Sequence, residues 1–508
     1  MNLARPRNNE YAFACSIVTK CKKAFSLFLC KNITGYADGN FRFWLGMLYN
    51  GNIGANNMEN LAKCTCQGYS SDGRGLVTVD GYTFPVRGLL KGEEAMVIIR
   101  PQGKGQFAGE IKELLKASPS RVLPVCPDYA SCGGCALQHM SYEKQLVFKK
   151  NLVQSELDKQ GIIFDVKPCL GMKDPYKYRN KVQSSYSMDY KGRVIGGFYV
   201  EGTHQIIDID QCYLEREEAD QIVNFFKTLL EKYEIDPYDR SSNYGSVRHV
   251  VVRSAFKTNQ VMVIIVTKTP ELPHESTLIK DLVAKFPNIT SIVHNINERP
   301  GNAVFGERDI VIYGPSYLEE ELSGLKFHIA PQSFFQVNPV QTEQLYAIAI
   351  ADAKLTGTEE VLDAYCGIGT IGLIAAKNAR HVTGVEVVGA SISSAQSNAR
   401  LNGITNSHFY CEDATVFVRD ALKDGRHFDV VFVDPPRSGC DFNFISALKA
   451  MKPSRIVYVS CEPSTLARDL ALLKTDYDIK DVQPVDMFPQ TFHVETCVLL
   501  SLKESHIS

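Results

Sequence analysis

The stretch that decides the fold is "LDAYCGIGTIG", residues 362–372. An apolar run with an aspartate near its start leads into Gly367 and Gly369, and a second apolar run follows. Because a side chain at either glycine would block the close approach of a ligand, the pattern is typical of a strand, a tight turn and a helix beside a ligand. It predicts the first unit of a parallel sheet.

The same alternation of strand and helix continues through residues 336–508. "HVTGVEVV" leads into "ASISSAQSNARLN", "FDVVFVDPP" into a helix near "FISALKAM", and "RIVYVSC" into "STLARDLALLK". Buried-looking strands that are each followed by a helix predict an α/β fold with a doubly wound, Rossmann-like parallel sheet. In such sheets ligands bind at the carboxyl ends of the strands.

The residues before this sheet divide into three further segments. Residues 1–59 show no periodicity and remain an unassigned N-terminal extension. Residues 60–123 contain short alternating runs between turn signals, which predict a small OB-like β-barrel. Residues 124–335 begin with a cysteine-rich loop and continue with mixed strands and helices, which predict an α+β middle domain.

Composition limits the classes of protein that the chain can belong to. Its 508 residues require several domains, and its apolar runs are too short to cross a membrane. A formal net charge of -2 argues against a protein that coats nucleic acid through salt-dependent attraction alone. Fifteen cysteines without an evident signal peptide indicate a reducing cytoplasm, where clustered cysteines bind metals or catalyse reactions more often than they form disulfides.

Two strand ends indicate the cofactor. Glu386 ends the strand after the glycine turn, where its carboxylate can accept hydrogen bonds from ribose hydroxyls. The glycine spacing fits both a dinucleotide oxidoreductase and a methyltransferase that uses S-adenosylmethionine. In "VVFVDPPRSG", residues 430–439, Asp434 precedes two prolines that fix a rigid loop and is expected to be exposed at the cofactor crevice. Such a loop favours a nucleobase methyltransferase.

A cysteine and a glutamate complete the predicted chemistry. Cys461 in "YVSCEPSTLARDL", residues 458–470, ends a strand before a helix, whose N-terminus is expected to favour the thiolate. A thiolate that adds to C6 of uracil makes C5 a carbanion-like nucleophile, and a base must later remove the C5 proton. Glu495 in "MFPQTFHVETCVLL", residues 487–500, is the best candidate for that base.

Cysteines also cluster far from this sheet. Cys126, Cys132 and Cys135 lie in "CPDYASCGGC", and Cys212 lies in "DIDQCYL". Their spacing suits a metal centre with thiolate ligands, either zinc or a four-iron cluster.

Taken together, these motifs resemble the RNA uracil-C5 methyltransferase family, in its branch with a TRAM barrel and an iron-sulfur cluster that acts on 23S ribosomal RNA. The resemblance implies that Cys126, Cys132, Cys135 and Cys212 hold a [4Fe-4S] cluster. It implies that the cofactor contacts Gln336, in "SFFQVN", and also Tyr365, Gly367, Gly369, Glu386, Asp413 and Asp434. It implies Cys461 as the nucleophile and Glu495 as the proton acceptor. Glu462, Gln490 and Thr370 depart from the usual residues of the family.

We therefore expect a cytoplasmic, monomeric enzyme, without a membrane partner, that methylates C5 of an extruded uridine in ribosomal RNA. Phe334 or Phe335 is a candidate to stack on that base. Three alternatives stay open: transfer RNA as the substrate, an amino-group methyltransferase that needs no cysteine, and a non-catalytic, cluster-bearing protein that binds RNA.

Overall fold

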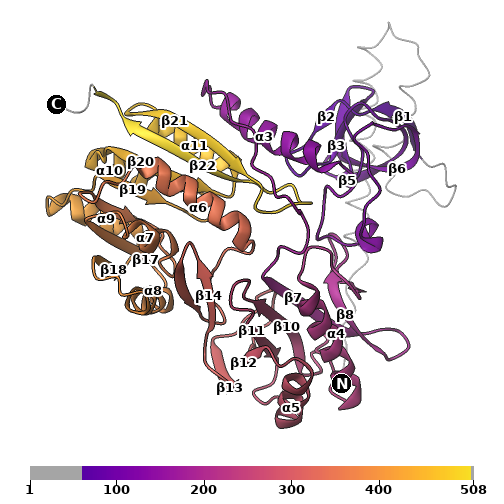
Figure 1. The fold of residues 1–508 in the computed structure, drawn as a ribbon. Helices are drawn as coiled ribbons and strands as arrows, with labels where there is room; N and C mark the ends of the chain where they lie inside the picture. The colour runs from indigo at the N-terminus through magenta and orange to yellow at the C-terminus, as the bar shows by residue number, and fades with distance from the viewer. Residues whose placement is uncertain (1–59, 505–508) are drawn as a thin grey trace, which may run out of the picture. The chain divides into compact units, whose positions relative to one another are not determined.

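The computed structural model describes residues 60–504, and the chain from Asn60 onward forms one compact unit (Figure 1). The predicted extension, residues 1–59, lies outside the described residues. Within residues 60–504, no helix is both long and apolar enough to cross a membrane.

The first sheet has six strands in the order β1-β5-β6-β4-β3-β2. These strands are β1 (Leu61–Thr65), β2 (Gly68–Tyr69), β3 (Gly75–Val79), β4 (Tyr82–Val86), β5 (Glu94–Gly103) and β6 (Gln106–Lys116). Buried and exposed side chains alternate along β3 and the first half of β5, because successive side chains of a strand point to opposite faces. The buried set forms a separate small core around Val77, Phe84 and Val97. The predicted β-rich segment is present, and its assignment as a TRAM barrel stays a prediction.

A short cysteine-bearing segment and one long helix follow. They are η1 (Pro127–Ala130) and α3 (Tyr142–Lys159). Val153 and Leu157 of α3 belong to the same core as the C-terminal sheet, and the helix packs against α11 (Pro463–Leu473). This helix therefore serves the C-terminal layer, although it precedes the middle sheet in the chain.

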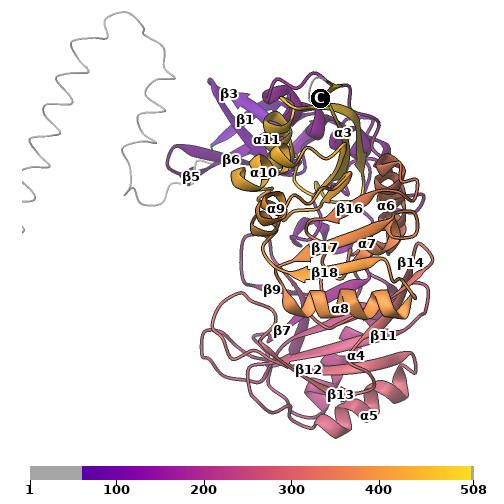
Figure 2. The same cartoon turned by 90° about the vertical axis from the view of Figure 1, so that its left-hand side faces the viewer.

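The middle sheet has seven strands in the order β13-β12-β11-β10-β7-β8-β9. These strands are β7 (Lys181–Met188), β8 (Val194–Tyr199), β9 (Ile206–Asp208), β10 (Val247–Ser254), β11 (Val261–Thr267), β12 (Ile289–Ile296) and β13 (Arg308–Tyr313). Helices α4 (Glu217–Lys232) and α5 (Glu275–Lys285) cover one face (Figures 1 and 2). The other face packs partly against the hairpin of β14 (Leu318–Leu322) and β15 (Leu325–Ile329), which leads into the C-terminal part.

The C-terminal sheet also has seven strands, in the order β18-β17-β16-β19-β20-β22-β21. The strands are β16 (Glu360–Asp363), β17 (His381–Glu386), β18 (Ser407–Cys411), β19 (Val430–Val433), β20 (Arg455–Ser460), β21 (Tyr477–Val485) and β22 (Glu495–Leu502). One face carries α6 (Pro339–Ala353), α7 (Thr370–Ala375) and α8 (Gly389–Leu401). The other carries α9 (Ala414–Lys423), α10 (Phe442–Met451), α11 and α3. Helices on both faces confirm the predicted doubly wound α/β fold.

Two features differ from the sequence prediction. The sheet is not wholly parallel, because β22 lies between β20 and β21 and runs antiparallel to both. The middle and C-terminal sheets also share one hydrophobic core, which contains Val251 and Ile264 of the middle sheet and Val361 and Val457 of the C-terminal sheet. The predicted domain boundaries, 60–123, 124–335 and 336–508, stay predictions.

Candidate active site

The predicted site residues gather at one edge of the C-terminal sheet. Strands β16, β17, β19 and β20 are mutually parallel, so their carboxyl ends lie together, at Asp363, Glu386, Asp434 and Cys461. Because β22 runs the other way, its first residue lies at this same edge. Ser460 pairs with Thr496, which brings Cys461 and Glu495 to adjacent strand ends. Residues that are far apart in sequence are therefore neighbours here.

The glycine turn behaves as the sequence predicts at one position and differently at the other. Gly367 and Gly369 both have positive φ angles, of 53° and 85°, which favour glycine. A Cβ at Gly367 would meet nothing within 4 Å, so this glycine borders open space. A Cβ at Gly369 would lie 3.2 Å from Ala395 of α8, so this glycine is required for packing as well as for the turn.

Three buried or half-buried carboxyl groups face this space. Burial raises the pKa of Asp363 and of Asp434 to about 7 and the pKa of Glu495 to about 8. The charge of Asp434 adds to the effect at the other two positions. Asp434 is half-buried rather than exposed, which corrects the sequence prediction. One oxygen of Asp363 accepts a 2.8 Å hydrogen bond from the Gly372 amide, while the other has no partner within the described structure.

Cys461 is half-buried at the end of β20, and its thiol is less acidic than the sequence predicted. Burial, then the nearby Glu495 and Asp434, raises its pKa to about 11, and the guanidinium of Arg437 opposes this only in part. Burial and the two carboxyl groups therefore oppose the effect that the sequence predicts for the N-terminus of α11. The Oε2 atom of Glu495 has no hydrogen-bond partner within residues 60–504, so the carboxyl group is available to a ligand.

Comparisons with known proteins agree with this chemistry. The sequence model of the tRNA (Uracil-5-)-methyltransferase family matches residues 307–503. An uncharacterized RNA methyltransferase of Halalkalibacterium halodurans is 43% identical over 450 residues, which cover 88% of this chain and 98% of that protein. A second one, of Clostridium tetani, is 43% identical over 436 residues, which cover 85% of this chain and 95% of that protein. The chain belongs to the RNA uracil-5-methyltransferase family.

A solved structure extends this likeness to the fold. The tRNA (uracil-54, C5)-methyltransferase of Pyrococcus abyssi, in complex with S-adenosyl-L-homocysteine, superimposes with a TM-score of 0.70 at 29% identity. The match covers 86% of this chain and 99% of that one. The α/β methyltransferase fold with its Rossmann-like sheet is thereby established for this RNA uracil-5-methyltransferase.

The other predicted cofactor residues of the methyltransferase differ in their surroundings. Gln336 is 5% exposed, and its backbone carbonyl accepts a 3.0 Å hydrogen bond from Asn180 Nδ2. Tyr365 is half-buried, and its ring lies 5.5 Å from that of Phe444. Glu386 accepts a 2.9 Å hydrogen bond from the Val388 amide. Asp413 accepts hydrogen bonds from the Thr415 and Val416 amides and so caps α9, a structural function that sequence reasoning did not identify.

The four predicted cluster cysteines of the methyltransferase line one cavity of about 120 Å³. Gly134 donates its amide to Cys132 Sγ over 3.3 Å, and Gln138 Nε2 donates to Cys135 Sγ over 3.2 Å. Burial raises the pKa of all four thiols. Within residues 60–504, however, no group of three or more His, Cys, Asp or Glu side chains is placed to hold a metal ion. The geometry thus brings the cysteines around one space without forming a single-ion site.

Sequence reasoning missed the connection between this cysteine segment and the active site. Gln490 lies in the loop between β21 and β22, has a φ of 69° and is 2% exposed. Its carbonyl accepts hydrogen bonds from Ala136 and Leu137, and its side chain and amide exchange hydrogen bonds with Gln145 of α3. Only its departure from the family pattern had drawn attention to it. The loop that precedes Glu495 is therefore held by the cysteine segment and α3.

A buried ion pair strengthens the same connection. Lys149 of α3 and Asp486 are both fully buried, and the lysine also donates to the Phe488 carbonyl over 3.0 Å.

The two phenylalanines that were candidates for stacking differ in exposure. Phe335 is 5% exposed and belongs to the core, whereas Phe334 is 68% exposed.

Proposed function

We propose that this methyltransferase transfers a methyl group from S-adenosylmethionine to C5 of a uridine in 23S ribosomal RNA, through a covalent adduct of Cys461 with C6. The observation that carries the proposal is the antiparallel insertion of β22. It supports a nucleophile and a proton acceptor at adjacent strand ends, which is the pair that C5 methylation requires.

The carboxyl groups at the strand ends favour the binding of a positively charged cofactor. When bound, S-adenosylmethionine supplies the methyl group on a positively charged sulfonium. Asp363 and Asp434 are held at raised pKa values because no cation compensates their burial. A cation beside them would favour their ionised forms and would also offset the repulsion that these carboxylates exert on a thiolate at Cys461. Gln336, Tyr365, Gly367, Glu386 and Asp413 are the further contacts that we propose.

The reaction then uses Cys461 twice. Its thiol loses its proton to water, Sγ forms a bond to C6 of the uracil, and the electron pair of the C5–C6 double bond moves toward O4 to give an enolate. C5 takes the methyl group as the S–CH₃ bond of the sulfonium breaks, which leaves neutral S-adenosylhomocysteine. Glu495 accepts the proton from C5, the double bond forms again, and the C6–S bond breaks to release Cys461.

A trapping experiment tests the adduct. An RNA with 5-fluorouridine at the target position has no proton that Glu495 can remove, so methylation should stop at the covalent stage. We expect a protein–RNA conjugate, stable in denaturing gels, that maps by mass spectrometry to Cys461 and requires S-adenosylmethionine. A conjugate elsewhere, or none from an RNA that is methylated when it contains uridine, would overturn the mechanism.

We also propose that Cys126, Cys132, Cys135 and Cys212 hold a [4Fe-4S] cluster. Sulfurs around a tetrahedral zinc lie only about 4 Å apart, given Zn–S bonds of about 2.3 Å. The cavity that all four cysteines line supports this proposal. The cluster would fasten the cysteine segment to β9 and the loop after it. Anaerobic purification followed by iron and sulfide analysis tests this proposal. A protein that contains neither zinc nor iron, with its four cysteines as free thiols, would refute it.

The choice of RNA has a specific competitor. The matching family model and the Pyrococcus abyssi enzyme are both named for transfer RNA. The resemblance to the branch with a cysteine centre supports ribosomal RNA instead. Mapping 5-methyluridine in both RNA classes, with and without the gene, distinguishes them: loss from 23S ribosomal RNA alone supports our proposal, and loss from transfer RNA alone refutes it.

A further inference from the structure

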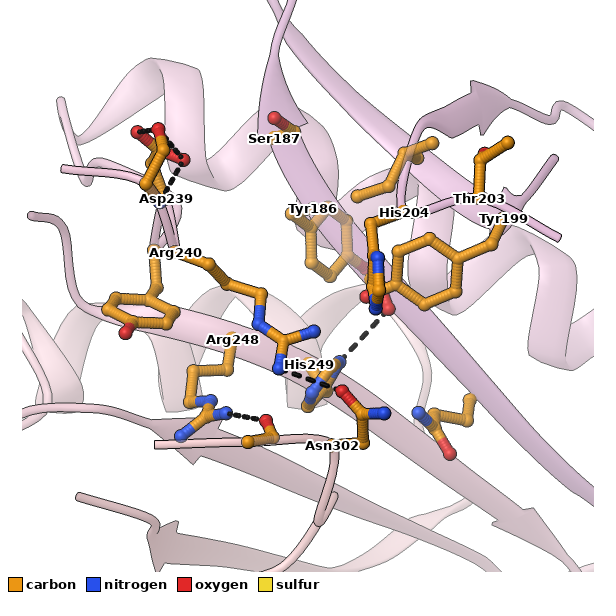
Figure 3. Close-up of a pocket in the computed structure, with 16 residues that line it drawn as sticks. Tyr186, Ser187, Tyr199, Thr203, His204, Asp239, Arg240, Arg248, His249 and Asn302 are labelled. Carbon is orange, nitrogen blue, oxygen red and sulfur yellow. Dashed lines mark hydrogen bonds between the residues drawn. The ribbon is translucent and has the colours of Figure 1, made fainter. Parts of the chain in front are cut away.

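A second cavity, of about 470 Å³, opens on the middle sheet, away from the strand ends of the methyltransferase sheet (Figure 3). Four segments line it: the middle of β7, the end of β8 with the turn that leads into β9, the loop before β10 with the start of β10, and the loop between β12 and β13. Figure 3 shows Tyr199 and His204 on one side and Arg240 and Arg248 on the other. Nothing in the proposed reaction uses this cavity.

The positive charge of the cavity is not compensated. Arg248 is 5% exposed and donates only to the carbonyl oxygens of Asn297, Arg299 and Gly301, at 2.7–3.2 Å. Its guanidinium lies 5.0 Å from the centre of the Tyr238 ring. Within the described chain it forms no ion pair, although a buried cation normally has a carboxylate partner. The cavity thus presents charge that an anion would neutralise.

Arg240 adds a second cation at the rim. It is exposed, and its Nη2 donates to Asn302 Oδ1 over 2.8 Å rather than to a carboxylate. Asp239 is the one acidic residue that lines the cavity, and the hydroxyl and amide groups of Ser241 and Ser242 already bind its carboxylate. These bonds hold the loop that carries Arg240 and favour the ionised form of Asp239, and within residues 60–504 no ion pair joins this carboxylate to Arg240.

The remaining walls are aromatic and polar. Tyr199 and His204 lie edge to face with ring centres 6.0 Å apart. His249 forms a 3.0 Å hydrogen bond with Ser185 Oγ, and burial together with the two nearby arginines lowers the pKa of His249 to about 4, so it is neutral at pH 7. Rings, neutral hydrogen-bonding groups and uncompensated cations are the combination that binds a base together with its phosphate.

The strand that carries Tyr199 also borders the cysteine cavity. Phe198 lines the cysteine cavity and Tyr199 the second cavity, because neighbouring residues of a strand point to opposite faces. Cys132 forms a β-bridge with Val200, and Arg74 and Arg87 of the first sheet both pair with Glu201. The turn after β8 is therefore fixed by the cysteine segment and by the six-stranded sheet.

Polar side chains extend from the cavity along β7, and cross-strand contacts continue to the segment before Phe334. Lys181, Gln183 and Ser185 occupy every second position of this strand and therefore lie on one face. Gln183 and Ser185 line the cavity. Lys181 pairs across the sheet with Arg253, which donates to the Pro331 and Ser333 carbonyls directly before the exposed Phe334. The four-residue separation of Lys181 and Ser185 corresponds to about 13 Å along an extended strand.

We propose that this second cavity binds a nucleotide of the substrate RNA outside the target uridine, with its phosphate on Arg240 and Arg248 and its base between Tyr199 and the polar floor of β7. The proposal rests on the proposed function, because it takes RNA as the substrate. The cavity then acts as a second anchor that sets which uridine reaches Cys461.

The exposed Arg240 and the half-buried Tyr199 at the end of β8 allow a test of the cavity. We would measure binding of the full chain to an RNA that it methylates, for Arg240→Ala, for Tyr199→Ala and for Arg419→Ala, an exposed arginine of α9, as the matched control. Each cavity variant should raise the Kd about tenfold, and the control should not. For Arg240→Ala, the slope of log K against log salt should become shallower by about 0.7, the value for one phosphate contact with single-stranded RNA.

Two further readouts identify the ligand. Ultraviolet crosslinking of the wild-type complex should attach a nucleotide to Tyr199 or Tyr238, and the loss in kcat/KM should be larger for long RNA than for a five-nucleotide RNA around the target. Cavity variants that bind RNA like Arg419→Ala, while the wild-type protein methylates it, overturn the second anchor and leave the proposed function standing. Tight binding of free AMP or UMP to the cavity without any effect on RNA also overturns it. A wild-type protein that methylates no RNA refutes the proposed function itself.

Discussion

The two seven-stranded sheets of this methyltransferase carry opposite uncompensated charge. At the strand ends of the C-terminal sheet, Asp363, Asp434 and Glu495 share a small volume, and their pKa values are raised. On the middle sheet, burial and neighbouring arginines lower the pKa of Lys181 to about 8, and burial lowers that of Arg253 to about 10. In both places the charged form is disfavoured until an opposite charge arrives. The difference indicates a cationic ligand for one sheet and an anionic ligand for the other.

The largest expected effect is on methyl transfer, which depends on the C-terminal sheet and can be measured separately from RNA binding. Cys461→Ala removes the nucleophile, so methyl transfer should fall by on the order of 10⁴-fold or more, whereas the Kd for RNA should change by less than about twofold. Single-turnover transfer of a labelled methyl group and RNA binding would be measured together. Cys411→Ala, at an exposed cysteine of β18, is the control and should remain active. Residual activity close to wild type would remove Cys461 from the reaction.

The next effect concerns Glu495. Glu495→Gln cannot accept the C5 proton, so turnover should fall by about 10² to 10⁴-fold while methylated adduct accumulates on Cys461. In the wild-type enzyme, kcat/KM should rise with pH through about 8, as Glu495 loses its proton and becomes able to accept one. Glu462→Gln, beside the nucleophile, should keep this profile. A flat profile, or a variant without trapped adduct, would contradict the assignment.

Lys181 provides the corresponding test on the middle sheet. No ion pair to Lys181 exists within residues 60–504, so Lys181→Met should weaken RNA binding about tenfold without changing kcat at saturating RNA. Because the lysine loses its charge as pH rises through about 8, the wild-type affinity for RNA should decline over that interval, and the variant should not show the decline. Fluorescence anisotropy across pH 6–9 measures both quantities.

The smallest expected effect is on stability. A carboxyl group whose pKa is higher in the folded than in the unfolded state binds extra protons when folded, so its contribution to stability is lost as pH rises through the folded value. For Asp434 this loss should be about 1 kcal/mol between pH 6 and pH 8. Asp434→Asn should remove that share of the pH dependence in thermal unfolding. S-adenosylmethionine should stabilise the wild-type protein more at pH 8 than at pH 6, and the reverse order would refute the electrostatic argument.

The sequence predicted the site where local pattern and local geometry coincide. Strand ends follow from periodicity, so the edge positions of Asp434 and Cys461 were predictable. The ionisation of Cys461 was not, because burial and two carboxyl groups that come from other strands outweigh the helix N-terminus. The antiparallel placement of β22 depends on pairing between distant segments, which no local pattern encodes.

The second cavity shows the same limit more clearly. Tyr199 ends β8, whereas Arg240 and Asn302 lie in two separate loops. The three residues share no motif in sequence, and only the folded sheet brings them together. Arg248 looks like an ordinary strand residue in sequence, and its missing carboxylate partner is visible only when its surroundings are known. By contrast, Cys126, Cys132 and Cys135 form an evident motif in sequence, and they line one cavity together with Cys212, the distant fourth cysteine.

The position of β22 has a consequence for synthesis in the cell. Glu495 enters the sheet only when β22 slides between β20 and β21, two strands that the ribosome has already released. Until then the emerging polypeptide exposes the edges of β20 and β21, with Cys461 present but without its partner. The pairing of β22 with β20 and β21 must therefore form before Glu495 can lie beside Cys461, so the proposed reaction depends on the strand of this sheet that is synthesised last.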